Sequence, residues 1–283
     1  MSNFLNFISS YWWIGAGVLA ILLYKVILRV FFGLVIVPED KIGLVTKKFV
    51  LFGSNKELNG DRIISTKGEA GFQAKTLSAG LHWWMWPWQY VVDMQGFIVI
   101  PEGHIGLVSA KDGSVPKTGR ILGRRVECEN YQDAEAFLSN GGQKGRQAAF
   151  IPNGVYKINT HLFEVSTVKQ AIIQENMVGI VTTLDGEPLE NGQIAGKNVD
   201  SGKDGHSNFQ NFDAFLELGG NRGLQQQIIL AGTYNLNPWA VAVEEVQMTE
   251  IPIGHKLLLE NLYWVVKHLN TSLLFLTLNM QMH

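Results

Sequence analysis

The residue types that commonly carry catalysis or metal binding are present, but their spacing forms no familiar reaction centre. The only cysteine, Cys128, lies among charged residues in a strand-like segment, and the sequence places no partner base for a catalytic thiol. No Gly-x-Ser-x-Gly turn occurs. No two histidines stand at metal-ligand spacing; they are His82, His104, His161, His206, His255, His268 and His283. We therefore predict no catalytic residue, no cofactor site and no metal site.

A glycine-rich basic segment, Gly141-Gly-Gln-Lys-Gly-Arg146, invites comparison with a phosphate-binding loop. It lacks the spacing of such a loop and the Ser or Thr after Lys that would bind magnesium. A similar later segment has Arg222 in place of Lys144. A helix C-cap followed by a cation explains both versions.

Four carboxylates lie close together in the sequence, namely Glu127, Glu129, Asp133 and Glu135. They could form a carboxylate pair for acid and base chemistry. The corresponding later segment keeps only Asp200 and Asp213. A solvated face is therefore the simpler interpretation.

Aromatic residues are concentrated in the segment His82-Trp-Trp-Met-Trp-Pro-Trp-Gln-Tyr90. Alternation along a strand would place Trp84, Trp86 and Trp88 on one side, with Trp83 on the other. Amphipathic rings are favoured at the headgroup level of a bilayer, and at least one side should pack in the core. Membrane contact by the three tryptophans, ordinary packing and a carbohydrate-stacking platform all remain open.

The elements that would position this segment begin with an apolar stretch near the N-terminus. A membrane span from about Phe7 to Leu28 has Trp12 and Trp13 at one interface. Lys25 and Arg29 are four residues apart and share one helix face, from which their stems can snorkel toward the headgroups. We expect these four side chains to anchor the chain.

A buried core helix and a cleaved signal peptide are the alternatives for this stretch. The first ten residues hold no Lys or Arg, and the cations follow the apolar run, which is the reverse of a signal peptide. Lys41, Lys47 and Lys48 add to the cations after the span. The positive-inside bias predicts a single-pass protein with most of the chain in the cytoplasm.

Internal repetition is the most informative feature of the remaining sequence. Three short apolar strands share one pattern, namely Ile42-Gly-Leu-Val45, Ile105-Gly-Leu-Val108 and Val178-Gly-Ile-Val181. A Gly-x-Gln element recurs three times at Gly71, Gly145 and Gly223, with identical spacing to a later glycine. A short helix is expected in the second and third copies; in the second, Asp133 is the expected N-cap and Gly141 the C′ residue. Such repeats usually stack on their neighbours.

Composition agrees with this organisation. The chain has 283 residues, of which 46% are hydrophobic and 17% charged, and its net charge of −2 excludes the basic footprint of a nucleic-acid-binding protein. Its 30 glycines favour many short strands. We predict a β-rich α+β protein, divided into an anchor segment (1–37), three modules (38–100, 101–172 and 173–250) and a divergent tail (251–283).

The anchor, the strand Val37-Pro-Glu-Asp-Lys-Ile-Gly-Leu-Val45 and the element Gly80-Leu-His-Trp83 with Pro87 resemble the SPFH or Band 7 superfamily of stomatin, prohibitin, flotillin and HflK/C. The repeated elements resemble long bacterial flotillin-like members with extra modules, and the likeness covers about Val35 to Ile253. It implies tandem SPFH-like modules in a membrane-bound homo-oligomeric scaffold. Its implied partners are the lipid bilayer and a membrane protease or NfeD-type protein.

The tail departs from this resemblance. It holds no charged heptad region for the coiled coil of the family, so it is expected to be a truncated, frame-shifted or divergent natural end. A second function remains open, namely a membrane-tethered envelope hydrolase or ligand-binding protein with its site in the loop 186–209, which is rich in Gly, Asn, Asp and Ser.

Overall fold

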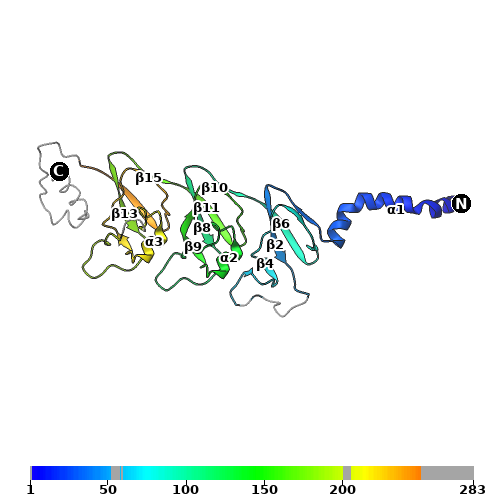
Figure 1. Ribbon diagram of the computed structural model, residues 1–283, viewed down its shortest axis with the longest axis horizontal. Coiled ribbons are helices and arrows are strands. Elements are labelled where there is room, and N and C mark those ends of the chain that lie inside the picture. The colour runs from blue at the N-terminus through cyan, green and yellow to red at the C-terminus, as the bar shows by residue number, and fades with distance from the viewer. Residues whose placement is uncertain (1, 52–57, 59, 200–204, 250–283) are drawn as a thin grey trace. The chain divides into compact units, whose positions relative to one another are not determined.

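The computed structural model describes residues 2–51, 58, 60–199 and 205–249. The long helix α1 (Ser2–Phe31) comes first, and the regular elements after it are mostly short strands (Figure 1). The predicted β-rich chain with one N-terminal apolar helix is confirmed. The predicted tail, residues 251–283, lies outside the described residues.

Helix α1 ends where glycine allows the chain to turn. Gly33 has a φ of +60°, a left-handed conformation that is cheap only for glycine. The backbone amide of Leu34 donates to the carbonyl of Leu28 at 3.2 Å, which satisfies one of the carbonyls left unpaired at a helix end. Arg29 lies in the last turn, where a cation interacts favourably with the helix dipole.

One pattern of strand pairing occurs three times along the described chain. In each case a three-residue strand pairs with a later three-residue strand to form a two-stranded ribbon. The ribbons are β1 (Val35–Val37) with β5 (Gly80–His82), β7 (Ile98–Ile100) with β10 (Gly154–Tyr156), and β12 (Ala171–Ile173) with β15 (Gly232–Tyr234).

A larger sheet accompanies each ribbon, and its middle strand is flanked antiparallel by two others. The sheets are β4 (Gly71–Gln73), β2 (Lys41–Lys47) and β6 (Tyr90–Gly96); β9 (Gly145–Ile151), β8 (His104–Ala110) and β11 (Phe163–Lys169); and β14 (Gly223–Leu224), β13 (Met177–Thr183) and β16 (Val241–Gln247). β3 (Ile64–Ser65) extends the first sheet in parallel with β4. The predicted apolar strands are the middle strands, and they are mostly buried on both faces.

Two short helices occupy the predicted places, α2 (Ala134–Ser139) and α3 (Phe212–Glu217). Gly141 has a φ of +77°, and the amide of Gly142 donates to the carbonyl of Phe137 at 2.8 Å. This is the Schellman ending, and it confirms Gly141 as the C′ residue. α2 begins directly after Asp133, the expected N-cap.

The chain divides into two compact units. The first comprises Met1–Ile98 with Tyr131–Glu135 and Tyr156–Leu162, and the second comprises the remaining residues. Segments from different predicted modules thus belong to one unit. The boundaries at 100, 172 and 250 stay a prediction.

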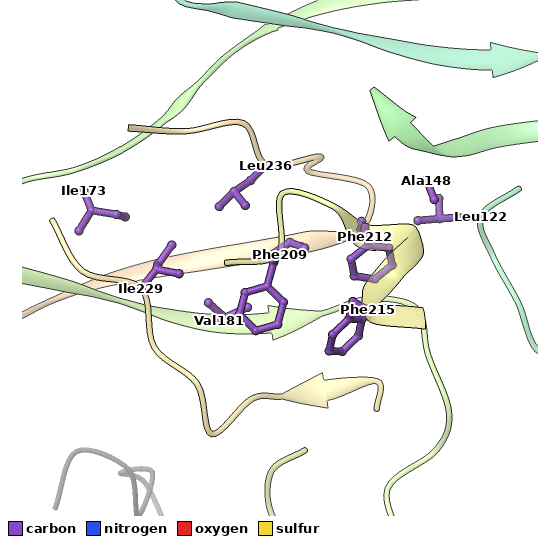
Figure 2. Packing of buried hydrophobic residues seen from close by; sticks show 11 residues of the cluster. Leu122, Ala148, Ile173, Val181, Phe209, Phe212, Phe215, Ile229 and Leu236 are labelled. Atoms are coloured by element: carbon purple, nitrogen blue, oxygen red, sulfur yellow. The ribbon is translucent and has the colours of Figure 1, made fainter. Parts of the chain in front are cut away.

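Phenylalanines from α3 and the turn before it form the centre of the second unit's main apolar cluster. The ring of Phe215 contacts those of Phe209 and Phe212, with centroids 5.4 and 5.2 Å away. Leu122 and Ala148 belong to the same cluster (Figure 2). The cluster therefore joins segments from two predicted modules in one continuous core.

Candidate membrane-interface site

Helix α1 contains a segment that is long and apolar enough to cross a membrane. The segment Trp12–Phe31 has 20 residues and a mean hydropathy of 2.1, and none of it is buried. At its middle, Ile21 and Leu22 are 72% and 74% exposed. In the described structure it is therefore not the buried core helix that the sequence left open.

The length of this segment matches a bilayer. Twenty residues at about 1.5 Å per residue span about 30 Å, the thickness of the hydrocarbon core. Trp12 and Trp13 are exposed at its first end. The expected span from Phe7 to Leu28 overlaps this segment and ends three residues earlier.

The aromatic segment is bonded to the other end of the helix. The indole nitrogen Nε1 of Trp86 donates to the carbonyl of Phe31 at 3.1 Å. The amides of Trp84 and Met85 donate to the carbonyls of Phe32 and Gly33 at 3.1 and 2.9 Å. These three bonds fix the aromatic segment to the last residues of α1.

Gly33 is needed for this contact. A Cβ added at that position would lie 2.7 Å from the backbone nitrogen of Met85 and 2.8 Å from that of Trp86. Both distances are shorter than any ordinary contact, and both neighbours are backbone atoms. The left-handed φ and this close approach together require glycine.

The aromatic segment is a turn, so the predicted strand is wrong. β5 ends at His82 and β6 begins at Tyr90. Between them Trp84 has a φ of +66°, and the amide of Tyr90 donates to the carbonyl of Trp86 at 2.8 Å. The equivalent segments after β10 and β15 also turn, so the turn belongs to the repeat, and the three bonds to α1 are particular to the first copy.

Trp84, Trp86 and Trp88 nevertheless lie together. The ring centroids of Trp84 and Trp86 are 5.4 Å apart, and those of Trp86 and Trp88 are 5.6 Å apart and nearly parallel. Trp84 is 63% exposed and Trp88 is also exposed, whereas Trp86 is half-buried. We call these three rings the tryptophan ladder. It combines a packed middle ring with two rings that face outward.

Cations surround the junction of helix and ladder. Lys25 and Arg29 line a groove of about 570 Å³ between the end of α1 and β6. The ammonium group of Lys48 donates to the carbonyl of Pro87 at 2.9 Å, which braces the turn that carries Trp88. Tyr90 lines the groove, and burial raises the pKa of its phenol, so the hydroxyl is neutral at physiological pH.

The corresponding turns in the later copies make a different contact. Three residues after β10, the side-chain amide of Asn159 donates to the carbonyls of Gln73 and Ala74, each at 3.0 Å. Three residues after β15, Asn237 donates to the carbonyls of Gln147 and Ala148, each at 2.9 Å. In the first copy this position is Met85, which contacts the end of α1.

The sequence interpretation missed these residues, although two signals were present. Asn159 and Asn237 stand at one position of the repeat, where the first copy has Met85. Gly33 lies two residues after the end of the apolar helix, at the C′ position. Comparison of the three copies at this position would have marked the aromatic turn as the exception.

The loop 186–209, the alternative site, is packed at both described ends. Glu187 and Gly196 form bridges with Asn221 and Gln225. Near the other end, His206 is buried, and its Nδ1 accepts from the amide of Phe209 at 2.9 Å. Residues 200–204 lie outside the described residues.

The carboxylates, the cysteine and the histidines singled out in the sequence show no arrangement for catalysis or metal binding among the described residues. Glu127, Glu129, Asp133 and Glu135 are all exposed, as expected of a solvated face. Cys128 is buried. In the part of the chain that the structure describes, His, Cys, Asp and Glu form no group of three that could hold a metal ion.

A mixed-charge cavity of about 670 Å³ lies in the second unit, lined among others by Arg120, Arg124, Glu187 and Asp213. Burial raises the pKa of Asp213, whose carboxylate accepts from the amide of Arg125 at 2.8 Å. Asp185 accepts from the amides of Ile121 and Leu122. Because these carboxylates bind backbone amides, they hold neighbouring segments together.

The resemblance to SPFH or Band 7 proteins has no independent support from other proteins. A comparison of the chain with models of protein families, with curated proteins and with solved structures gives no significant match.

Proposed function

We propose that this chain is a non-enzymatic, membrane-anchored scaffold of the SPFH or Band 7 flotillin-like type. The observation that carries the proposal is the bond from Trp86 to the carbonyl of Phe31, 3.1 Å long. It holds the tryptophan ladder at one end of a 20-residue apolar helix whose other end has Trp12 and Trp13. Aromatic residues at both ends of a 30 Å span are typical of a membrane protein.

The charges favour an orientation with the β-rich part on the cytoplasmic side. Lys25, Arg29, Lys41 and Lys48 all lie at or beyond the ladder end of α1. Cations flanking a span are retained on the cytoplasmic side. The anchor would be single-pass, with Lys25 and Arg29 extending their side chains toward the headgroups.

Exposed apolar residues support self-association. In the ribbon of β1 and β5, the paired residues Ile36 and Leu81 are 63% and 60% exposed. Val99, Val155 and Ile172 are exposed at the middle of the other ribbon strands. These exposed apolar side chains recur at one position of the repeat. Two copies of the chain could therefore bury them by packing their ribbons against each other. Organisation of lipids and of partners such as a membrane protease or NfeD-type protein would follow from such assembly.

Flotation with liposomes tests the membrane anchor. The full chain is compared with a variant that lacks residues 2–31, using vesicles of neutral phosphatidylcholine in a density gradient followed by alkaline carbonate extraction. We expect the full chain to float and to resist carbonate, and the deletion to stay in the aqueous fraction. A chimera in which an unrelated apolar helix of equal length replaces α1 is the matched control, and it should float.

Equal flotation of the deletion and the full chain would contradict the anchor. Circular dichroism of the deletion checks that the β-rich part remains folded, so that a failure to float is not caused by unfolding. Retention of the full chain in the aqueous fraction would also overturn the proposal.

Light scattering of the detergent-solubilised chain tests self-association. The double substitution Ile36→Ser and Leu81→Ser removes the apolar pair from the first ribbon without touching the buried core. We expect a lower mean mass than for the unchanged chain. A single monomeric species for the unchanged chain would refute the scaffold part of the proposal.

A further inference from the structure

The groove beside the end of α1 has two walls of different origin. One wall is the helix from Tyr24 to Arg29. The other is formed by β6 and by Met85 and Pro87 of the aromatic turn. Its volume of about 570 Å³ lies within the range of small-molecule sites.

All charged side chains that line the groove are positive. Lys25 and Arg29 are four residues apart and therefore lie on one face of α1. None of the lining residues is acidic, and Asp93, the acidic residue of β6, is not among them. Within the described residues, neither cation has an ion-pair partner. The groove is thus complementary to an anion.

Apart from the phenols of Tyr24 and Tyr90, the remaining lining is apolar. Leu28 of the helix faces the groove together with Met85, Val91 and Met94. Two cations above an apolar surface suit a ligand with an anionic head and a hydrocarbon body. A free phosphate would satisfy only the cations and would leave the apolar wall in water.

The depth of the cations fits the same ligand. Arg29 and Lys25 precede the end of the span by two and six residues, or about 3 Å and 9 Å along the axis. Long basic side chains at this depth reach the phosphate layer by snorkelling. The tryptophan ladder, bonded to Phe31, lies at the level of the same layer.

We propose that this groove binds one anionic phospholipid of the leaflet at which α1 ends, with Lys25 and Arg29 on its phosphate and its acyl chains against Leu28, Met85 and Met94. The inference rests on the proposed membrane anchoring and adds a ligand class to it. Binding would select anionic lipid for the immediate surroundings of each copy.

Native mass spectrometry of the detergent-solubilised full chain measures the selection, with equal amounts of phosphatidylglycerol and phosphatidylcholine added at low ionic strength. We expect bound phosphatidylglycerol to exceed phosphatidylcholine, and the double variant Lys25→Gln and Arg29→Gln to lose this preference by roughly thirtyfold. The variant Lys67→Gln and Lys75→Gln removes the same charge from exposed positions of the first unit outside the groove, and it should keep the preference.

The substitution Met94→Glu tests the groove without altering the helix. Met94 is partly exposed in β6, and a carboxylate there should also abolish the preference, because it would offset the positive charge of Lys25 and Arg29 that favours the anionic lipid. An unchanged preference in Lys25→Gln and Arg29→Gln would overturn the inference, and so would an equal loss in the Lys67 and Lys75 control. Flotation of the unchanged chain and of every variant on neutral vesicles separates the two proposals. An unchanged chain that floats but shows no preference for phosphatidylglycerol refutes the groove alone, whereas an unchanged chain that does not float refutes the anchor.

Discussion

Asn237 offers a quantitative test of how the repeats are joined. Its side chain is nearly fully buried and donates to the carbonyls of Gln147 and Ala148, while its oxygen accepts from the amide of Trp239 at 2.9 Å. The substitution Asn237→Asp keeps the shape and the acceptor but removes both donors. The two carbonyls, on buried residues, would then face a carboxylate.

The expected loss follows from these bonds. Two amide hydrogen bonds contribute about 1 kcal/mol each, and buried carbonyls left without partners raise the total to about 3 kcal/mol. A loss of about 3 kcal/mol corresponds to a change on the order of a hundredfold in a local opening equilibrium. Asn159→Asp should show a similar loss, because Asn159 makes the same pair of bonds to Gln73 and Ala74.

Hydrogen–deuterium exchange read by mass spectrometry is the assay. The amides of Ala240 and Val241 donate to the carbonyl of Asn237, so peptides covering them report whether this turn is closed. We expect on the order of a hundredfold faster exchange in Asn237→Asp, with exchange of the first sheet unchanged. Exchange within a factor of about three of the unchanged chain would correspond to less than about 1 kcal/mol and would refute the role assigned to Asn237.

Three further changes have defined outcomes. The double substitution Ile21→Arg and Leu22→Arg places two charges at the middle of the span, and each charge opposes insertion by about 3 kcal/mol. It should abolish carbonate-resistant flotation. Flotation equal to that of the unchanged chain would count against a spanning helix. Gly33→Ala should detach the aromatic turn, because the left-handed φ alone costs about 1–2 kcal/mol and the new Cβ would lie 2.7 Å from a backbone nitrogen. Tryptophan fluorescence should shift to the red in that variant, whereas an unshifted spectrum would contradict the close approach. Burial raises the pKa of Asp213 above its ordinary value of 3.8, so its ionisation costs stability as pH rises from that value to the folded pKa. Asp213→Asn should therefore raise the melting temperature at pH 7, and the difference should vanish below about pH 3.8, where the residue is protonated in both states; a lower melting temperature at pH 7 would contradict this.

Features with a local cause could be predicted from the sequence. The strands around Ile42, Ile105 and Val178 were found because a strand buried on both faces needs a continuous apolar run. Gly141 was recognised because a helix end favours glycine in the left-handed conformation.

Features that depend on distant segments could not be predicted. Asn237 and its acceptor on Gln147 are 90 residues apart, and no local sequence pattern predicts a hydrogen bond between them. Tryptophan and tyrosine favour strands, so the run before Tyr90 was interpreted as one. It is instead a turn whose backbone and indole bond to Phe31, Phe32 and Gly33, 52 or more residues earlier in the chain.

The short joint between α1 and the first sheet has a mechanical consequence. Three residues separate Phe31 from Val35, and three hydrogen bonds clamp that stretch to the aromatic turn. A helix in a bilayer thinner than its own apolar length relieves the mismatch by tilting. Because the connection is short and hydrogen-bonded, a tilt of the helix would rotate the attached strands through a similar angle. The thickness of the bilayer would then determine the angle between the sheet and the membrane surface.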